Sequence, residues 1–470
     1  MSHRLTTPGQ RPPSSPPSNP LSRLRRRAAQ GIAGASVASV VVTGCTVQAD
    51  PGVTTVTDGG ADSSADVYDD SVVHSVAVEI DDDAYTAMLE TYQESGDKEW
   101  ISGTVTIDGE TFQNVGLRLK GNSSLRSVDT SAAPTDLPWL IDLDKNVDGQ
   151  ALDGWTEFVV RSNSTETALN ESVALALLEE AGLAGEHAVA TGFSVNGAEE
   201  ELRLVVQNLD DDWDEERFDT EGVLYKAESG GDYSYRGEDP EDYAEVFDQE
   251  TDKDDEDLSP LIDFLQFVNE SSDAEFADQL ADRLDVEAFA TYLAFEDLID
   301  NFDDIDGPGN NSYLRYDGAS GSFTVVAWDH NLAFGASPQG GQDGGGRAGG
   351  GPAGQVGGDG AQPPDGMEPP QGMERPEGGA DMPAGADGGG FGGAGGGSNI
   401  LVERFTTNAE LNELYEQATT ELQASLFESG AAQEVLDSWA TLLTDEAGDL
   451  VDAATVEEEA AAIAEYFDEK

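Results

Sequence analysis

Two short sequences organise the interpretation of this chain: Asn301-Phe302-Asp303 continuing to Asn310-Asn311, and Trp328-Asp329-His330-Asn331-Leu332-Ala333-Phe334-Gly335. They place carboxylates and a carboxamide at the ends of two expected elements, a helix over 286–300 and a hairpin over 313–328. Magnesium prefers hard oxygen ligands, and phosphoryl transfer needs charge neutralisation and a carboxylate that orients the attacking hydroxyl. The pattern therefore predicts a Mg²⁺-nucleotide site in which Asp303 orients the acceptor, while Asp329 and Asn311 hold the metal.

Simpler interpretations compete with this site. The chain has 95 acidic residues, so an Asp cluster beside glycine is often a solvated turn. The order Asp304-Ile305-Asp306-Gly307 resembles part of a calcium-binding loop, but Pro308 replaces the next ligand and the closing Glu is missing. Neighbouring residues leave the roles in the loop open, namely Asp303, Asp304 or Asp306 for the carboxylate and Asn310 or Asn311 for the carboxamide.

Seven landmarks along the chain together resemble one family. In order they are Val115 to Ser124 (VGLRLKGNSS), Asn170-Glu171, Val195-Asn196-Gly197, Leu224-Tyr225-Lys226, Asn301-Phe302-Asp303, Asn310-Asn311 and Trp328-Asp329. From about Val73 to the end, the sequence resembles the CotH-type atypical secretory protein kinases, named after spore coat protein H. The resemblance implies a reduced protein-kinase-like, two-lobed α+β fold with a β-rich N-lobe and a mainly helical C-lobe. It also implies phosphorylation of secreted proteins with ATP and Mg²⁺ or Mn²⁺.

The nucleotide-binding part of the expected site needs a cation, because the phosphates concentrate negative charge. It also needs a glutamate that holds this cation in place. The resemblance implies that Glu171 is the helix glutamate. Family members often show a basic residue after the aromatic Trp139, but this chain has Leu140 there. Lys120 and Lys226 fall inside family motifs and are the candidate substitutes. The alternative for each is a surface lysine whose stem covers apolar neighbours.

A second departure keeps an inactive alternative open. Gln207 stands where a glutamate usually follows the strand after Asn196-Gly197, and Gln keeps hydrogen bonding but loses the charge. With Leu140, it is consistent with a catalytically silent, kinase-like surface protein that binds partners. The retained Asp303, Asn311 and Asp329 favour catalysis. A third, weaker interpretation is calcium-dependent adhesion through the acidic loops.

The charge of the 470-residue chain is extreme. Its formal net charge is −72, and Lys and Arg together number only 23. Self-repulsion of this size destabilises a compact state unless salt screens it, and at molar ionic strength the Debye length is about 3 Å. We therefore expect a salt-rich, halophile-like setting. Nucleic acid is disfavoured as a partner.

Residues 1–45 have the pattern of a signal peptide with a lipobox. Arg25-Arg26-Arg27 precede a small-residue and apolar stretch over 28–42, which is too short to span a bilayer. The segment ends in Val42-Thr43-Gly44-Cys45, which resembles a bacterial lipobox, and Cys45 is the only cysteine. We expect lipidation at Cys45, a lipid anchor on the extracytoplasmic face of the cell membrane, and exported proteins as substrates.

The remaining chain divides by composition. Residues 46–72 are expected to be a flexible tether, 73–335 the kinase-like domain, 336–398 a disordered Gly/Pro-rich insertion, and 399–470 the C-terminal helical part. The insertion is a passive linker, a lid or a docking tether. Strand patterns occur at 76–80, 105–107, 115–119, 140–143, 158–160, 193–195 and 202–206, with a hairpin turn at Asp108-Gly109. A helix is expected from an Asn163 cap to Gly182, with Leu169, Val173 and Leu177 on one face.

Overall fold

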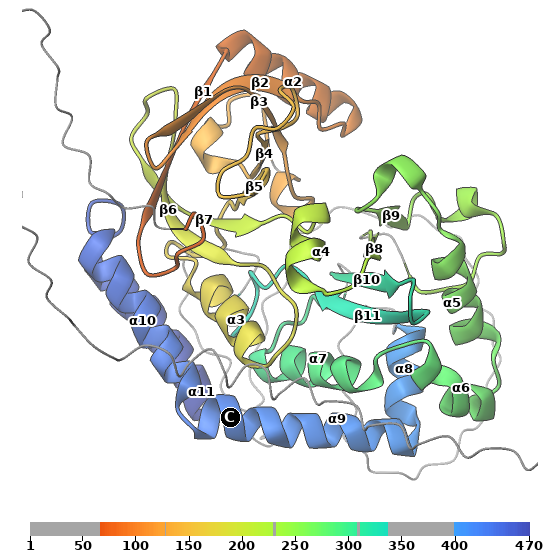
Figure 1. Ribbon diagram of the computed structural model, residues 1–470. Coiled ribbons are helices and arrows are strands. Elements are labelled where there is room, and N and C mark those ends of the chain that lie inside the picture. The colour runs from red at the N-terminus through yellow and green to blue at the C-terminus, as the bar shows by residue number, and fades with distance from the viewer. Residues whose placement is uncertain (1–65, 127, 229–231, 308–310, 337–398) are drawn as a thin grey trace, which may run out of the picture. The chain divides into compact units, whose positions relative to one another are not determined.

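The computed structural model describes residues 66–126, 128–228, 232–307, 311–336 and 399–470 (Figure 1). They belong to one unit, Ser64–Lys470. The expected signal peptide with Cys45, residues 46–65 of the tether, residues 337–398 of the Gly/Pro-rich insertion and Asn310 lie outside the described residues. Within these ranges the structure is α+β, rich in sheet toward the N-terminus and helical toward the C-terminus, as the sequence predicts.

Seven strands form a closed barrel, which the sequence analysis did not foresee (Figure 1). The strand order is β1-β2-β3-β4-β5-β7-β6, and parallel pairing of β1 with β6 closes it. Closure removes the unpaired edges of an open sheet. The strands are β1 (His74–Ile80), β2 (Ile101–Ile107), β3 (Glu110–Leu119), β4 (Trp139–Asp142), β5 (Glu157–Val160), β6 (Ala188–Val195) and β7 (Glu201–Gln207).

The expected strands and their tight turn are confirmed. Asp108 and Gly109 both have positive φ, at 47° and 85°, which is the geometry of the favoured two-residue hairpin turn between β2 and β3. Helix α2 (Asp82–Ser95) was not predicted; it begins at the cap Asp81 and buries Met88 and Leu89 against the barrel core.

Helix α3 (Leu169–Glu180) begins later than expected. The prediction that Asn163 caps it is wrong, because Asn163 has a φ of 38° and its carboxamide binds the backbone of β7, at Leu202 O and Leu204 N. Tertiary hydrogen bonds thus outcompete the local cap. The predicted face of the helix is confirmed, and Gly182, with a φ of 78°, follows its end.

A second, four-stranded antiparallel sheet and the remaining helices form the C-terminal part. The sheet order is β11-β10-β8-β9, with β8 (Gly222–Ala227), β9 (Phe247–Gln249), β10 (Ser312–Asp317) and β11 (Ser322–Ala327). The helices are α4 (Asp211–Arg217), α5 (Ser259–Glu270), α6 (Asp273–Gln279), α7 (Val286–Ile299), α8 (Ile400–Thr407), α9 (Ala409–Leu422), α10 (Ala431–Glu446) and α11 (Ala453–Asp468).

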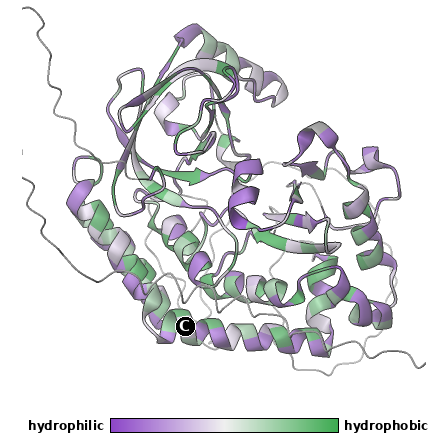
Figure 2. Cartoon of the chain, in the orientation of Figure 1, coloured by the Kyte–Doolittle hydropathy of each residue, from purple (hydrophilic) through white to green (hydrophobic). Residues whose placement is uncertain are grey.

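One hydrophobic core joins the barrel to the helices. Leu140 and Val159 leave the barrel strands on the outer face and pack in the same cluster as Leu169 of α3. Their strand neighbours Ile141 and Val160 point inward instead, because successive strand residues alternate between faces. Figure 2 shows hydrophilic and hydrophobic residues mixed along α9 and α10, as expected of helices that bury one side only. α10 packs on α3 and so links the C-terminal segment to the barrel side.

Candidate functional site

An arginine links the barrel, α3 and the end of β11. Arg161 directly follows β5, and its Nη2 lies 2.7 Å from Glu171 Oε1, while its Nε donates to Glu171 Oε2 at 3.2 Å. The same Nη2 also donates to Asp329 Oδ1. The guanidinium suits this geometry because its planar fork presents several donors at once. The three side chains therefore form one ion-paired unit, the Arg161 triad.

Burial makes this triad electrostatically strong. The Glu171 side chain is 4% exposed, that of Arg161 12% and that of Asp329 22%. Burial by itself would lower the pKa of Arg161, but Asp329 and Glu171 together raise it above its usual value. The arginine therefore stays charged, and it lies between two carboxylates that would otherwise repel each other.

Lys120 lies beside the triad. It follows β3, its Nζ donates to Asn208 Oδ1 at 2.5 Å, and it stands 5.5 Å from the ring centroid of Trp328. Arg161 lies 5.8 Å from the same ring, so two cations lie near Trp328. The pKa of Lys120 is lowered to about 8, mainly by burial; the charge of Glu250 opposes this shift and that of Lys226 adds to it. The structure thus brings Lys120, Arg161, Glu171 and Asp329 together.

Lys226 is on β8 and belongs to a neighbouring ion pair. Its Nζ lies 2.9 Å from Glu228 Oε1, and both side chains are largely buried. Its charge also reaches Lys98, whose pKa is lowered mainly by burial and then by Lys226 and Arg118. In a chain of net charge −72, these cations lie close together, with the carboxylates of Glu228 and Glu250 beside them.

The loop after α7 is held by a buried network. Asn301 Nδ2 donates to Glu296 Oε2 at 2.8 Å, and His330 Nε2 lies 3.1 Å from Glu296 Oε1. His330 is fully buried, so it supports the site from behind and does not line it. This network ties the loop that carries Asp303 to the residue after Asp329.

The hydrogen bonds of the loop after α7 fix the positions of only some of the expected metal ligands. Asp303 lies half-buried in the loop, and Asn311 N donates to Asp304 O at 3.1 Å. Asp304 is 9% exposed, and burial raises its carboxyl pKa, which makes it a poorer charged ligand. Among the described residues, no three His, Cys, Asp or Glu side chains are grouped to hold a metal ion. The pairing of Asn311 with Asp329 stays a prediction.

The two departures from the family pattern have structural roles. Leu140 is 1% exposed and packs in the core beside α3, where a charge would be costly. Gln207 is fully buried; its Oε1 accepts from His187 N at 2.8 Å and its Nε2 donates to Glu216 Oε2 at 3.3 Å. Neither residue is part of the triad.

The donors present suit a phosphate-bearing ligand with its cation. Arg118 Nε is buried and has no hydrogen-bond partner within the described ranges, and its charge contributes to lowering the pKa of Lys120. A buried donor of this kind is costly unless an anion satisfies it. Asp329 and Asn311 supply the carboxylate and carboxamide oxygens that magnesium prefers.

The molecule is therefore an α+β protein with paired charges where its barrel, α3 and second sheet adjoin. It belongs to the CotH kinase protein family, whose model matches residues 117–466. This match confirms the resemblance drawn from the sequence motifs, and family membership indicates a kinase-like function. A search of curated proteins finds no match.

Sequence reasoning missed Arg161. The available signal was a basic residue directly after the buried strand Phe158–Val160 and ten residues before the helix glutamate. Glu296 was missed as well, since a glutamate inside an apolar helix pattern carries no local mark of its buried partners.

Proposed function

We propose that the protein is an ATP-dependent protein kinase that transfers the γ-phosphoryl group to Ser or Thr hydroxyls of exported proteins. The observation that carries the proposal is the Arg161 triad. A cation paired to a helix glutamate and lying beside the aspartate at the end of a hairpin is the arrangement that phosphoryl transfer requires for positioning and charge neutralisation. Arg161 here takes the role that the sequence analysis assigned to a lysine.

Each side chain has a role in this proposal. Arg161 and Lys120 bind the phosphates, and Glu171 holds Arg161 in place. Asp329 and Asn311 would hold Mg²⁺ or Mn²⁺, which supplies neutralisation of the phosphate charge when bound. Because Arg161 engages Oδ1 of Asp329, Oδ2 is the oxygen that we assign to the metal. Asp303 accepts the proton of the acceptor hydroxyl. Lys226, paired with Glu228, adds positive charge near Lys120.

The test is transfer from labelled ATP to a generic protein acceptor by protein lacking residues 1–45, in high salt with Mg²⁺. We expect transfer that is lost in Asp329→Asn and in Asp303→Asn. Glu79→Gln, an exposed position on β1, serves as the charge-matched control and should retain activity. Absence of both transfer and metal-dependent nucleotide binding in the unaltered protein would refute the proposal.

The second candidate function is a silent, kinase-like binding protein. It is favoured by one observation: Asp329 is already engaged by Arg161, and an internally satisfied site can serve structure alone. Nucleotide binding that does not depend on metal, with no transfer, would support this alternative.

The cellular setting is also proposed. We assign lipidation to Cys45 and a place on the extracytoplasmic face of the cell membrane, which supports exported proteins as substrates. Across the ranges that the structure describes, no helix has both the length and the apolar character needed to cross a bilayer. Incorporation of a labelled fatty acid, lost in Cys45→Ala, tests the anchor.

A further inference from the structure

The segment that precedes β1 covers one end of the barrel. Residues 66–73 form turns and not a helix or a strand, and we call them the strap. Val67 is only 5% exposed and packs in the same core cluster as Val76 and Phe158, which face the barrel interior. Its backbone N–H donates to Asp153 Oδ2 at 3.1 Å. The strap is therefore part of the packed barrel end at which β1 begins.

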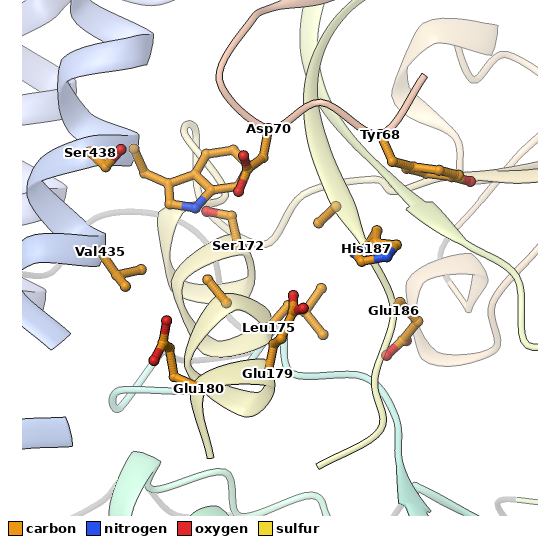
Figure 3. A pocket seen from close by; sticks show the side chains of 13 residues that line it. Tyr68, Asp70, Ser172, Leu175, Glu179, Glu180, Glu186, His187, Val435 and Ser438 are labelled. Carbon is orange, nitrogen blue, oxygen red and sulfur yellow. The ribbon is translucent and has the colours of Figure 1, made fainter. Parts of the chain in front are cut away.

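The strap also forms one wall of a cavity. Tyr68 and Asp70 line this cavity of about 370 Å³ together with residues of α3 and α10 (Figure 3). The centroid of the Tyr68 ring lies 6.1 Å from that of His187. At the end of the strap, Val73 N donates to Glu446 Oε2 of α10 at 3.3 Å. Release of the strap would therefore open both the barrel end and this cavity.

His74 joins the strap to the barrel. It is the first residue of β1, and its side chain is 3% exposed. Its Nδ1 lies 2.7 Å from Asp108 Oδ2 in the turn between β2 and β3, and its Nε2 lies 3.0 Å from the backbone carbonyl oxygen of Asp69 in the strap. Asp108 Oδ1 also accepts from Ser75 N at 2.9 Å. One imidazole ring thus connects the strap to the hairpin turn.

These two contacts require a proton on each ring nitrogen. A carboxylate and a backbone carbonyl can only accept, whereas a neutral imidazole donates from one nitrogen and turns a lone pair toward the other oxygen. Burial would raise the pKa of Asp108, but hydrogen bonds from His74 and Ser75 N hold it below its ordinary value, so this carboxyl group is ionised. The geometry therefore calls for the imidazolium form of His74.

The surroundings of His74 support the charged form. Burial by itself would lower the pKa of His74, but the hydrogen bonds with Asp108 and Asp69 and the charges of these two residues raise it above its ordinary value. The other side chains that lie beside the ring in the barrel interior come from β1, β2, β4, β5, β6 and β7; they are aliphatic, aromatic or, at Thr191, a hydroxyl. Asp108 and Asp69 are thus the charges that face His74.

We propose that the strap is a pH-sensitive device: the imidazolium of His74 fastens residues 66–73 across the barrel end, and loss of its proton releases them. Without that proton, one ring nitrogen and its partner oxygen have no hydrogen between them, so one of the two bonds is lost. Residues 46–65 lead from the strap to Cys45. With the anchor proposed there, release of the strap would add up to about 28 Å to the reach of the tether. The device does not rest on the proposed kinase function.

The first measurement is the NMR titration of the histidine ring protons in the purified full chain, in 1 M NaCl. Salt at this concentration screens the surface carboxylates, whose summed charge would otherwise shift every histidine. The His74 signal is identified by its absence from the spectrum of His74→Gln. We expect the pKa of His74 to lie above the ordinary 6.5.

The second measurement is amide hydrogen exchange of residues 66–73 between pH 6 and pH 9, corrected for the intrinsic dependence of exchange on pH. A raised histidine pKa contributes stability that is present below the ordinary pKa and is lost as pH rises through the folded-state pKa. Opening of the strap should therefore become more frequent over this range, by about tenfold for each unit by which the measured pKa exceeds 6.5.

Three variants identify the group responsible. His74→Gln cannot titrate, so its strap should open often at pH 6 and change little up to pH 9. Asp108→Asn keeps the histidine but removes the charge beside it, so the pKa of His74 should fall and opening should begin at lower pH. His187→Gln is the matched control, because it makes the same replacement at another histidine that lies against the strap; it should keep the pH dependence of the unaltered chain.

Two results would overturn the proposal, and the unaltered chain alone can give either of them. One is a His74 pKa at or below 6.5. The other is exchange of residues 66–73 that, after correction, does not change between pH 6 and pH 9. The same pH dependence in the unaltered chain and in His74→Gln would also contradict it, because another group would then control the strap.

Discussion

Arg161 connects two carboxylates that are far apart in the sequence. It is separated from Glu171 by ten residues and from Asp329 by 168. The first spacing is visible in the sequence, and it could have predicted the pair with Glu171. The second is not, because the contact depends on how the hairpin β10–β11 packs beside the barrel. The sequence therefore predicted Asp329 from its place at the end of the hairpin and Glu171 through the family resemblance, but not the group that joins them.

Replacing Arg161 should separate stability from activity. Arg161→Met leaves Glu171 buried and unpaired, so we expect the free energy of unfolding to fall by about 3 kcal/mol. Transfer should fall at least roughly 100-fold, as when a preorganised charge is removed from an active site. Urea unfolding and initial rates with saturating ATP measure the two effects.

The double variant Arg161→Met with Glu171→Gln is the matched control. It removes both charges, so stability should largely return while transfer stays lost. A double variant that recovers activity together with stability would show that the triad serves folding only. Arg161→Lys keeps the charge but lacks the planar fork of donors. Its stability and its transfer rate should therefore lie between those of the unaltered chain and those of Arg161→Met.

Glu186 should make stability depend on pH. Burial raises its pKa from the ordinary 4.5 to about 7 in the folded chain, although the charges of His330 and Arg161 oppose this shift. Between these two values the unfolded chain has released the proton that the folded chain still holds. The free energy of unfolding therefore falls as pH rises from 4.5 to 7. Glu186→Gln cannot ionise, so relative to the unaltered chain it should gain about 2–3 kcal/mol at pH 8 and little at pH 4.5.

Denaturant unfolding at a series of pH values, in a buffer free of amines, checks this expectation. The exposed Glu79→Gln should differ from the unaltered chain by the same small amount at every pH. A Glu186→Gln difference that does not change between pH 4.5 and 8 would mean that this carboxyl group titrates normally.

At the scale of elements, the start of α3 was predicted wrongly for a specific reason. The turn before α3 is capped from a distant element: Glu459 of α11 accepts from Glu166 N at 3.0 Å and from Thr167 N at 3.1 Å, and it also binds the Thr167 hydroxyl. The helical repeat of apolar residues in α3 and the face that they form were predictable, because both depend on local spacing. Its start was not, since the turn that precedes the helix is held by a side chain almost 300 residues later.

Glu459→Ala should therefore destabilise the protein by about 1–2 kcal/mol, because it removes the carboxylate that accepts from two backbone N–H groups of this turn. The neighbouring Glu458 is exposed on the same helix, so Glu458→Ala loses an equal charge without the contact. We expect Glu458→Ala to change stability little, as measured by the urea midpoint. Equal effects of the two substitutions would indicate loss of helix charge rather than loss of a cap.

At the scale of the whole molecule, the sequence predicted the individual strands but not their closure into a barrel. Each barrel strand was predicted at least in part from an alternating or apolar pattern, but the first parts of β2, β3 and β6 were missed. The closing pair β1–β6 joins Val76 to Phe193 and Val78 to Val195, so closure depends on partners more than a hundred residues apart. Non-local pairing of this kind leaves no periodicity for a single sequence to show.

The net charge of −72 is a property of the whole molecule, and it should make stability depend on ionic strength. Between 0.1 M and 1 M NaCl the Debye length falls from about 10 to about 3 Å, so repulsion among surface carboxylates is largely screened. We expect the midpoint of thermal unfolding to rise steadily over this range. The Arg161 triad, being buried, should be weakened far less than the surface repulsion is relieved. KCl at equal ionic strength should give the same gain, because screening depends on charge and not on the identity of the cation. An unfolding midpoint that is flat or falls with salt would show that attraction within ion pairs such as Arg161–Glu171 outweighs repulsion across the surface.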